Sequence, residues 1–269
     1  MHTVLTIAGS DCSAGAGIQA DMKTMFANGT YAMTVLTALT AQNTMGISDI
    51  MEVPADFVKE QIDSIYADIE PEAVKIGMMG SEENILVIAD RLSAYRAQPI
   101  VLDPVMVSTS GTRLLSDQSV ILMRQKLFPI VTLLTPNIPE AEVLSGQRIS
   151  SANEMETAAG LIGKSAHCAV LIKGGHFSGN ANDLLWEKNH MEWIYGKKIA
   201  NDNTHGTGCT LSSAIAANLA KGFLLYESVK RAKAYVGDVI AANMNLGHGK
   251  GPLDHGAGVT GIYMERENG

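Results

Sequence analysis

The chain has 269 residues, of which 46% are apolar and 18% charged, so it can bury a large core as a single domain spanning residues 1–269. Its 28 acidic and 20 basic residues give a formal net charge of −8, and no basic block is present. This charge argues against nucleic acid or an anionic membrane surface as a partner. Three cysteines without C-x-x-C spacing indicate neither a disulfide framework nor a zinc site. The N-terminus shows no basic region or cleavage site, and no apolar stretch reaches 18 residues, so we expect a soluble, cytoplasmic protein.

Apolar runs and segments of helical periodicity alternate along the chain. The strand-like runs are Val4–Ala8, Tyr31–Leu39, Val74–Met78, Ile100–Leu102, Val131–Leu134 and Val170–Ile172. The helical segments that follow most of them are Ala16–Ala27, Ala55–Ile69, Glu82–Tyr95 and Glu154–Ser165. This order predicts an α/β fold with a mostly parallel sheet and helices on both faces.

The pattern changes after Asp183. The segment D-L-L-W-E-K, then Asn189-His190, then M-E-W-I-Y predicts a β-hairpin that turns at those two residues. Two helices, about Cys209–Lys221 and Glu227–Asn245, are expected to follow it. The glycine-rich end G-H-G-K-G-P-L-D-H-G-A-G is typical of a loop or tail.

Polar and glycine-rich segments follow each predicted parallel strand, and ligands of such sheets gather at the carboxyl ends of the strands. In chain order these segments are G-S-D-C-S-A-G-A-G-I-Q-A-D, T-A-Q-N-T-M-G, K-I-G-M-M-G, D-P-V-M-V-S-T-S-G-T, T-P-N-I-P-E and K-G-G-H.

A further turn, N-T-H-G-T-G-C-T, precedes the helix expected from Cys209. Gly206 and Gly208 allow a ligand to approach the main chain, and Thr204 or Thr207 is a candidate helix cap. The free amides and the dipole at this helix start favour an anion. They would also favour the thiolate of Cys209. The alternative is a buried structural cysteine beside a tight turn.

Each polar side chain in these segments also has a structural explanation. Asn137 can cap the helix that holds Glu140, Lys173 can be a surface lysine and Asp103 can be a turn residue. His176 and His205 fit polar loop residues better than metal ligands, and Met78-Met79 fits core filling. Together, however, the segments offer an amide nest, a lysine, acidic groups for a metal and apolar walls. Phosphoryl transfer uses that set, and the absence of G-x-x-x-x-G-K-[ST] excludes a P-loop enzyme.

The ordered blocks resemble a known family over about Leu5 to Pro252. G-S-D-x-S-x-G-A-G-I-Q-A-D, A-Q-N-T, K-I-G-M, D-P-V-M-V, T-P-N-x-x-E, K-G-G-H and N-T-H-G-T-G-C-T-L-S-S-A-I-A are similar to those of the hydroxymethylpyrimidine/phosphomethylpyrimidine kinases of thiamine biosynthesis, in the ribokinase superfamily. The resemblance implies a ribokinase-like three-layer αβα fold, commonly a homodimer. It also implies two successive phosphorylations with ATP and Mg²⁺, from hydroxymethylpyrimidine to its monophosphate and then to the diphosphate.

The resemblance also assigns roles by position. It makes the amides of Gly206, Thr207, Gly208 and Cys209 the anion hole for the transferred phosphoryl group, with the Cys209 side chain as base. The family's pyrimidine-binding positions correspond to Gly9, Asp21 and Gln42, and the apolar walls of the ring correspond to Met78 and Val105. Positions near the nucleotide phosphates correspond to Asn137, Glu140 and Lys173, with Asp103 and Glu140 on the Mg²⁺ side through water.

Two positions depart from the family's pattern. Ala14 stands where many relatives have glycine, which would stiffen the first loop slightly. Thr109 stands where several relatives carry lysine, and losing that cation would weaken binding of the phosphorylated substrate.

Three other functions compete with this one. A pyridoxine/pyridoxal kinase uses the same scaffold, although Gly-Thr-Gly-Cys and A-Q-N-T favour the pyrimidine enzyme. A Cys-His hydrolase using Cys209 with His205 or His176 would leave T-P-N-I-P-E and K-G-G-H unexplained. A nucleotide sensor without catalysis is the third.

Overall fold

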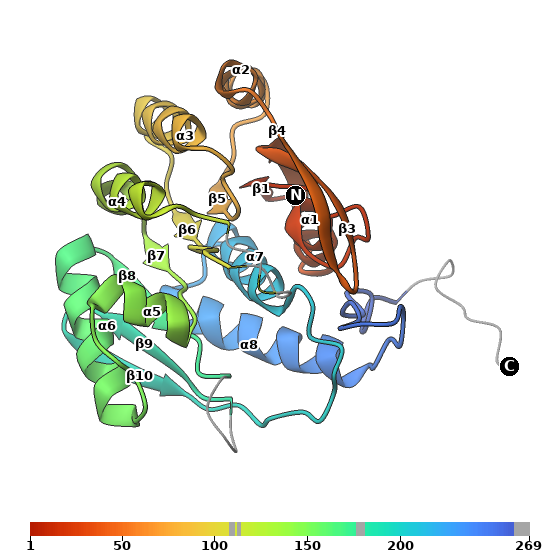
Figure 1. The fold of residues 1–269 in the computed structure, drawn as a ribbon, viewed down its shortest axis with the longest axis vertical. Coiled ribbons are helices and arrows are strands. Elements are labelled where there is room, and N and C mark those ends of the chain that lie inside the picture. The colour runs from red at the N-terminus through yellow and green to blue at the C-terminus, as the bar shows by residue number, and fades with distance from the viewer. Residues whose placement is uncertain (108–110, 112–113, 176–180, 261–269) are drawn as a thin grey trace, which may run out of the picture.

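A mixed sheet runs through the computed structural model, which describes residues 1–107, 111, 114–175 and 181–260. Within these residues the sheet has eight strands in the order β10-β9-β8-β7-β6-β5-β1-β2 (Figure 1). All neighbours from β2 to β8 pair in parallel, and β9 and β10 are antiparallel. The strands are β1 Thr3–Ala8, β2 Tyr31–Leu36, β5 Ala73–Ile76, β6 Ile100–Leu102, β7 Leu133–Leu134, β8 Ala169–Ile172, β9 Asp183–Glu187 and β10 His190–Ile194.

Helices cover both faces of this sheet, as the alternating pattern predicts (Figure 1). One face carries α1 Gly17–Ala27, α7 Thr207–Ala220 and α8 Leu225–Ala241. The other carries α2 Ala55–Tyr66, α3 Glu82–Ala94, α4 Asp117–Lys126, α5 Ile138–Ser145 and α6 Ala152–Ala166, with the short 3₁₀ helix Phe128–Ile130 after α4. The three-layer αβα arrangement is therefore confirmed.

Side chains of one strand alternate between two apolar clusters because successive residues point to opposite faces. In β1, Val4 packs in the cluster under α7 and α8, whereas Leu5 and Ile7 pack in the cluster under α2 and α3. Thr6 and, in β5, Lys75 are polar residues at fully buried positions of these central strands. They bond to the same carboxylate, which belongs to Asp21 of α1.

The predicted strand Tyr31–Leu39 is wrong as one element. The main-sheet strand β2 ends at Leu36, and β3 Ala38–Asn43 pairs antiparallel with β4 Gly46–Glu52 in a separate two-stranded sheet. Thr37 lies at the break, where its hydroxyl donates to the Met78 carbonyl and its own carbonyl accepts from the Val53 amide. These bonds turn the chain out of the main sheet, a tertiary effect that the continuous apolar run does not show.

The predicted hairpin is confirmed as β9–β10, but its turn lies one residue earlier than expected. Lys188 and Asn189 take positive φ angles of 48° and 66°, and His190 is already the first residue of β10. Two consecutive positive φ angles give the twist that joins antiparallel strands tightly.

No helix of the described residues is long and apolar enough to cross a membrane.

Candidate active site

Two glycine-rich turns meet where the parallel strands end. Gly206 has a φ of 84°, and a Cβ on it would lie 1.9 Å from the carbonyl oxygen of Gly15 in the loop after β1. Gly17, with a φ of 58°, would place a Cβ 2.4 Å from the carbonyl oxygen of Gly9. Both positions therefore need glycine, for its backbone conformation and for the close approach. In the same loop Ala14 takes a φ of 63°, which explains why a glycine suits that position.

The start of α7 leaves two amides available, whereas the Thr207 amide donates to the Thr204 carbonyl at 3.3 Å. The N-cap is Gly206 and no side chain caps the helix, so the expected capping by Thr204 or Thr207 is wrong. The Thr207 hydroxyl instead donates to the Thr204 carbonyl at 2.8 Å. Among the described residues, the amides of Gly208 and Cys209 have no partner outside the helix, and first-turn amides have none within it. The turn can accept an anion.

Asp103 and Lys173 lie against this helix start. The Lys173 ammonium donates to Asp103 Oδ1 at 2.7 Å, and a Cβ on Gly208 would lie 3.3 Å from both Lys173 Nζ and Asp103 Oδ2. Ser212 on the next turn of α7 donates to Asp103 Oδ2 at 3.4 Å. Burial is the largest single effect on the pKa of Lys173 and lowers it, but the charges of Asp103 and Glu140 and the hydrogen bond to Asp103 together raise it, and the net shift is upward. A cation, a carboxylate and free amides thus meet at one point.

Asn137 and Glu140 form a reciprocal cap at the start of α5. The Glu140 amide donates to Asn137 Oδ1 at 2.9 Å, and the Asn137 amide donates to Glu140 Oε2 at 2.8 Å. The capping role that the sequence left open for Asn137 is therefore real. Glu140 is 5% exposed, and burial, with a contribution from the nearby charge of Asp103, raises its pKa. Its other oxygen accepts from the Met106 amide at 3.3 Å.

The Cys209 thiol is not the low-pKa group that its place at a helix start predicts. Burial raises its pKa to about 11, although the charge of Lys75 and a hydrogen bond from the Gly17 amide act in the opposite direction. Desolvation outweighs both the Gly17 amide at the start of α1 and the charge of Lys75. The Cys209 thiol is therefore protonated at neutral pH in the protein without bound ligands.

Gln42 projects from the β3–β4 arm beside His205. The register of β3 and β4 shifts between Ala41 and Gln42, and such a bulge re-aims a side chain. Gln42 Nε2 lies 3.2 Å from His205 Nε2, which is itself 2.8 Å from Asp11 Oδ2. Gln42 and His205 line a recess of about 200 Å³ together with Asn43, Thr44, Met45, Gly46, Gly249 and Lys250. His205 thus bonds with Asp11 and Gln42 rather than with Cys209, which argues against the Cys-His hydrolase in its His205 form.

Met78, one of the two residues expected to form the apolar wall of the ring site, lies beside Gly9. A Cβ on Gly9 would lie 3.1 Å from the Met78 sulfur, so these two residues after β1 and β5 are neighbours. Met78 and Val105 keep some exposed surface, whereas Met79 is fully packed in the core. His176 and Thr109 lie outside the described residues.

Asp21 differs most from its expected position in the pyrimidine site. Its side chain is fully buried and accepts hydrogen bonds from Thr6 at 2.6 Å, Lys75 at 2.7 Å and Ser213 at 2.7 Å. Because the residue is 0% exposed, neither carboxylate oxygen faces an open site in this arrangement. Lys75 was missed as a site residue, although a lysine between Val74 and Ile76 in a short apolar strand is a recognisable signal.

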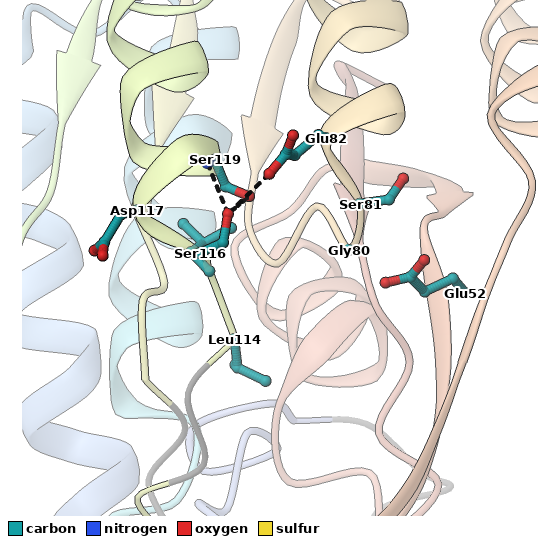
Figure 2. A pocket seen from close by; sticks show the side chains of 9 residues that line it. Glu52, Gly80, Ser81, Glu82, Leu114, Ser116, Asp117 and Ser119 are labelled. Carbon is teal, nitrogen blue, oxygen red and sulfur yellow. Dashed lines mark hydrogen bonds between the residues drawn. The ribbon is translucent and has the colours of Figure 1, made fainter.

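A second recess, of about 570 Å³, lies between the N-terminal ends of α3 and α4 (Figure 2). Glu52, Glu82 and Asp117 line it, and the Ser116 hydroxyl donates to Glu82 at 2.9 Å. Three carboxylates make it unsuitable for a nucleotide phosphate. It contains none of the residues that the sequence analysis selected.

A divalent cation is compatible with the residues near α7. No cluster of three His, Cys, Asp or Glu residues able to hold a metal is found in the described parts of the chain. Asp103 and Glu140 nevertheless provide two neighbouring carboxylates whose charges oppose each other, since Asp103 raises the pKa of Glu140. Mg²⁺ is commonly held by one or two carboxylates together with water and substrate phosphates. The donor set therefore fits Mg²⁺.

Comparison with known proteins extends over most of the chain. The family model described as phosphomethylpyrimidine kinase matches residues 11–254. The hydroxymethylpyrimidine/phosphomethylpyrimidine kinase of Streptomyces coelicolor is 45% identical over 253 residues, which are 94% of each chain. The thiamine biosynthesis bifunctional protein ThiED of Geobacter sulfurreducens is 46% identical over 254 residues, and the chain spans about half, 52%, of that longer protein.

Solved structures show the same fold. The phosphomethylpyrimidine kinase of Clostridium difficile is 43% identical with a TM-score of 0.79, covering 88% of this chain and 98% of that one. The pyridoxal kinase of Staphylococcus aureus in complex with AMP-PCP and pyridoxal is 35% identical with a TM-score of 0.87, covering 96% and 94%.

Proposed function

Because the chain belongs to the phosphomethylpyrimidine kinase family, a family of phosphotransferases, we propose that it phosphorylates hydroxymethylpyrimidine to the monophosphate and then to the diphosphate. ATP would be the phosphoryl donor and the product would enter thiamine biosynthesis. We also propose a cytoplasmic location, a compartment that supplies ATP. One observation supports phosphoryl transfer most directly: the free amides of the α7 start meet Lys173 and Asp103 within one helical turn.

These residues suit a loose transition state that requires positioning and charge neutralisation. The amides of Gly206 to Cys209 would hold the transferred group, and Lys173 would neutralise its charge. Asp103 and Glu140 would hold Mg²⁺ through water, and the ion would neutralise the nucleotide phosphates. Asn137 would shape this region through its bonds with Glu140.

Gln42 would recognise the edge of the pyrimidine ring, since its amide offers one donor group and one acceptor. Gly9, Met78 and Val105 would pack against the ring. Asp21 would support the site without touching the ring, because its carboxylate is fully buried and accepts hydrogen bonds from three protein side chains.

Cys209 is the proposed base, but its role depends on when the proton leaves. The thiol is protonated at neutral pH in the free protein, because burial raises its pKa to about 11. Cys209 could accept the proton of the substrate alcohol only as a thiolate, so the base role requires the thiol to lose its own proton to solvent before the phosphoryl group is transferred.

A pyridoxal kinase activity is the second candidate, because the Staphylococcus aureus pyridoxal kinase shares the fold at a TM-score of 0.87. The test incubates the protein with Mg-ATP and either hydroxymethylpyrimidine or pyridoxal, and follows ADP and phosphorylated products by mass. We expect the pyrimidine mono- and diphosphates to form faster than pyridoxal phosphate. If pyridoxal is phosphorylated faster, pyridoxal kinase becomes the first candidate. If no ADP forms with either substrate, both candidates are rejected. The ratio of the two pyrimidine products also tests the effect of Thr109 on the second step.

We also propose a homodimer. Leu39 of β3, Met51 of β4 and Phe57 of α2 are 39%, 61% and 60% exposed, so this region carries apolar surface that a second copy would cover. Sedimentation of the purified protein tests this, and a single monomeric species at micromolar concentration would reject it.

A further inference from the structure

Lys75 is a fully buried lysine in the middle of the central strand β5. Its side chain is 0% exposed, and the ammonium donates to Asp21 Oδ2 at 2.7 Å. A Cβ on Gly77 would lie 2.7 Å from the ammonium, so the chain after β5 leaves room for it only because residue 77 is glycine. Burying an ion pair in this way costs several kcal/mol of desolvation, and it is often no more stabilising than an apolar pair. Fold stability alone therefore does not explain why the pair lies here.

The Asp21 carboxylate connects four elements around the start of α7. It accepts from Thr6 of β1, from Lys75 of β5 and, through Oδ1, from Ser213 of α7 at 2.7 Å, while Asp21 itself belongs to α1. Ser213 follows Cys209 by four residues, so the two side chains lie on the same face of α7. The ion pair consequently lies one helical turn below the thiol.

Charges from every element packed on the thiol act on it. Lys75 interacts favourably with the thiolate, Asp21 and Asp103 interact unfavourably, and the Gly17 amide donates to the sulfur. Lys173, after β8, also interacts with Cys209. Lys75 contributes the largest of the effects that oppose burial.

We propose that Lys75 is a positioning residue for Cys209: through Asp21 and Ser213 it fixes the first turns of α7, and its ammonium supplies the positive charge beneath the thiol. A thiolate at this site would then be stabilised by a fixed internal cation and not by the helix start alone. The catalytic meaning of this arrangement rests on the proposed role of Cys209. The charge effect does not depend on that role and is measurable on the thiol itself.

The experiment measures the pKa of the Cys209 thiol from its rate of iodoacetamide labelling against pH. The exposed Cys12 is first removed by Cys12→Ser, and labelling is read on the Cys209 peptide by mass. In Lys75→Met the pKa should rise above its already raised value, because one nearby opposite charge is lost. At a fixed pH below the pKa, labelling should slow about threefold per unit, since a more basic thiolate is also more nucleophilic. If Asp21 takes up a proton in this variant, its unfavourable effect on the thiolate is lost as well. The favourable effect of Lys75 is the larger of the two, so the thiol pKa should still rise.

A second variant protects the test against misfolding. Lys75→Met combined with Asp21→Asn removes both charges, leaves no unpaired ion and keeps hydrogen-bonding groups for Thr6 and Ser213. It should fold and still show a raised thiol pKa, together with a lower kcat whose pH profile moves in the same direction. An unchanged thiol pKa in this folded variant would overturn the inference, even if the protein proves to be an active pyrimidine kinase. A raised thiol pKa would support it, even if the kinase assay failed.

Discussion

The α carbon of Gly206 faces the carbonyl oxygen of Gly15 so closely that a Cβ there would lie 1.9 Å from that oxygen. The contact fixes the turn before α7 against the loop after β1, two segments about 190 residues apart in the chain. The amides proposed to bind the phosphoryl group are therefore positioned by backbone packing between two glycine turns.

We predict that Gly206→Ala lowers kcat by about 10²-fold, because displacing a catalytic turn by about 1 Å has an effect of that order. Gly222→Ala is the matched control: Gly222 has nearly the same φ, 83°, but no atom within 4 Å of its Cβ position. The control should lose about 1–2 kcal/mol of unfolding free energy from backbone strain alone and keep its activity. Equal behaviour of the two variants in urea unfolding and steady-state kinetics would contradict the packing argument.

Gln42→Ala should raise the KM for hydroxymethylpyrimidine and leave the KM for ATP unchanged. Loss of the paired hydrogen bonds to a buried ring edge costs about 1–3 kcal/mol, or roughly 5- to 150-fold. Ser48→Ala, on the exposed surface of β4 in the same arm, serves as the control. If the pyrimidine KM of Gln42→Ala matches that of the control, Gln42 has no place in the substrate site.

Glu140→Gln should increase the Mg²⁺ concentration needed for half-maximal activity, because one of two neighbouring carboxylates near the phosphates is lost. Glu142→Gln removes a carboxylate from the same helix, where Glu142 accepts from the Ile149 amide. Magnesium titrations of the two variants and the wild type provide the comparison. Superimposable curves would leave Glu140 with its capping role alone.

Cys209→Ser should lower kcat by about 10²-fold or more if the thiol is the base, with little change in thermal stability. The hydroxyl has a similar shape but does not ionise in the accessible pH range. A purely structural cysteine predicts the reverse, namely a lower Tm from a hydroxyl in apolar surroundings and near-normal turnover. Because burial raises the pKa of the thiol to about 11, labelling of the free enzyme should be slow at neutral pH and accelerate in alkali.

The protein should lose stability in mild acid through His255. Burial lowers the pKa of this histidine from 6.5 to about 4, and its Nε2 lies 2.9 Å from the Thr210 hydroxyl at the start of α7. Between these two pH values the unfolded chain binds a proton that the folded chain does not, so the unfolding free energy falls as the pH is lowered from 6.5 towards 4.

Urea unfolding at pH 5 and pH 7 measures this loss. His255→Gln, which cannot titrate, should lose less stability between the two pH values than the wild type. The exposed His190 provides the control, since His190→Gln should behave like the wild type. Glu140, whose pKa is raised by burial, acts in the opposite direction over this range in all three proteins, so the comparison between variants is decisive. An equal change in stability for the wild type and His255→Gln would exclude His255 as an acid-sensitive contact.

Local sequence was sufficient for the parallel sheet, its flanking helices and the β9–β10 hairpin, because hydrophobic periodicity and turn residues act over a few positions. It was also sufficient to select Asp103, Lys173 and the turn at Gly206 to Cys209 as neighbours, since the carboxyl ends of parallel strands meet at one edge. Other features depend on partners far away in the chain. The break at Thr37 depends on Met78, and the re-aiming of Gln42 depends on the pairing of β3 with β4.

Tertiary structure alone decided the electrostatics of the site. The helix start predicted a thiolate at Cys209, yet desolvation by surrounding elements raises the thiol pKa instead. The cation that partly opposes this rise is Lys75, which lies 134 positions earlier in the chain. Asp21 likewise belongs to a family motif, but it is fully buried and bonds to Thr6, Lys75 and Ser213. A pKa and a buried hydrogen-bond network depend on all neighbours in space, many of which lie far away in the chain. A local stretch of sequence therefore does not reveal them.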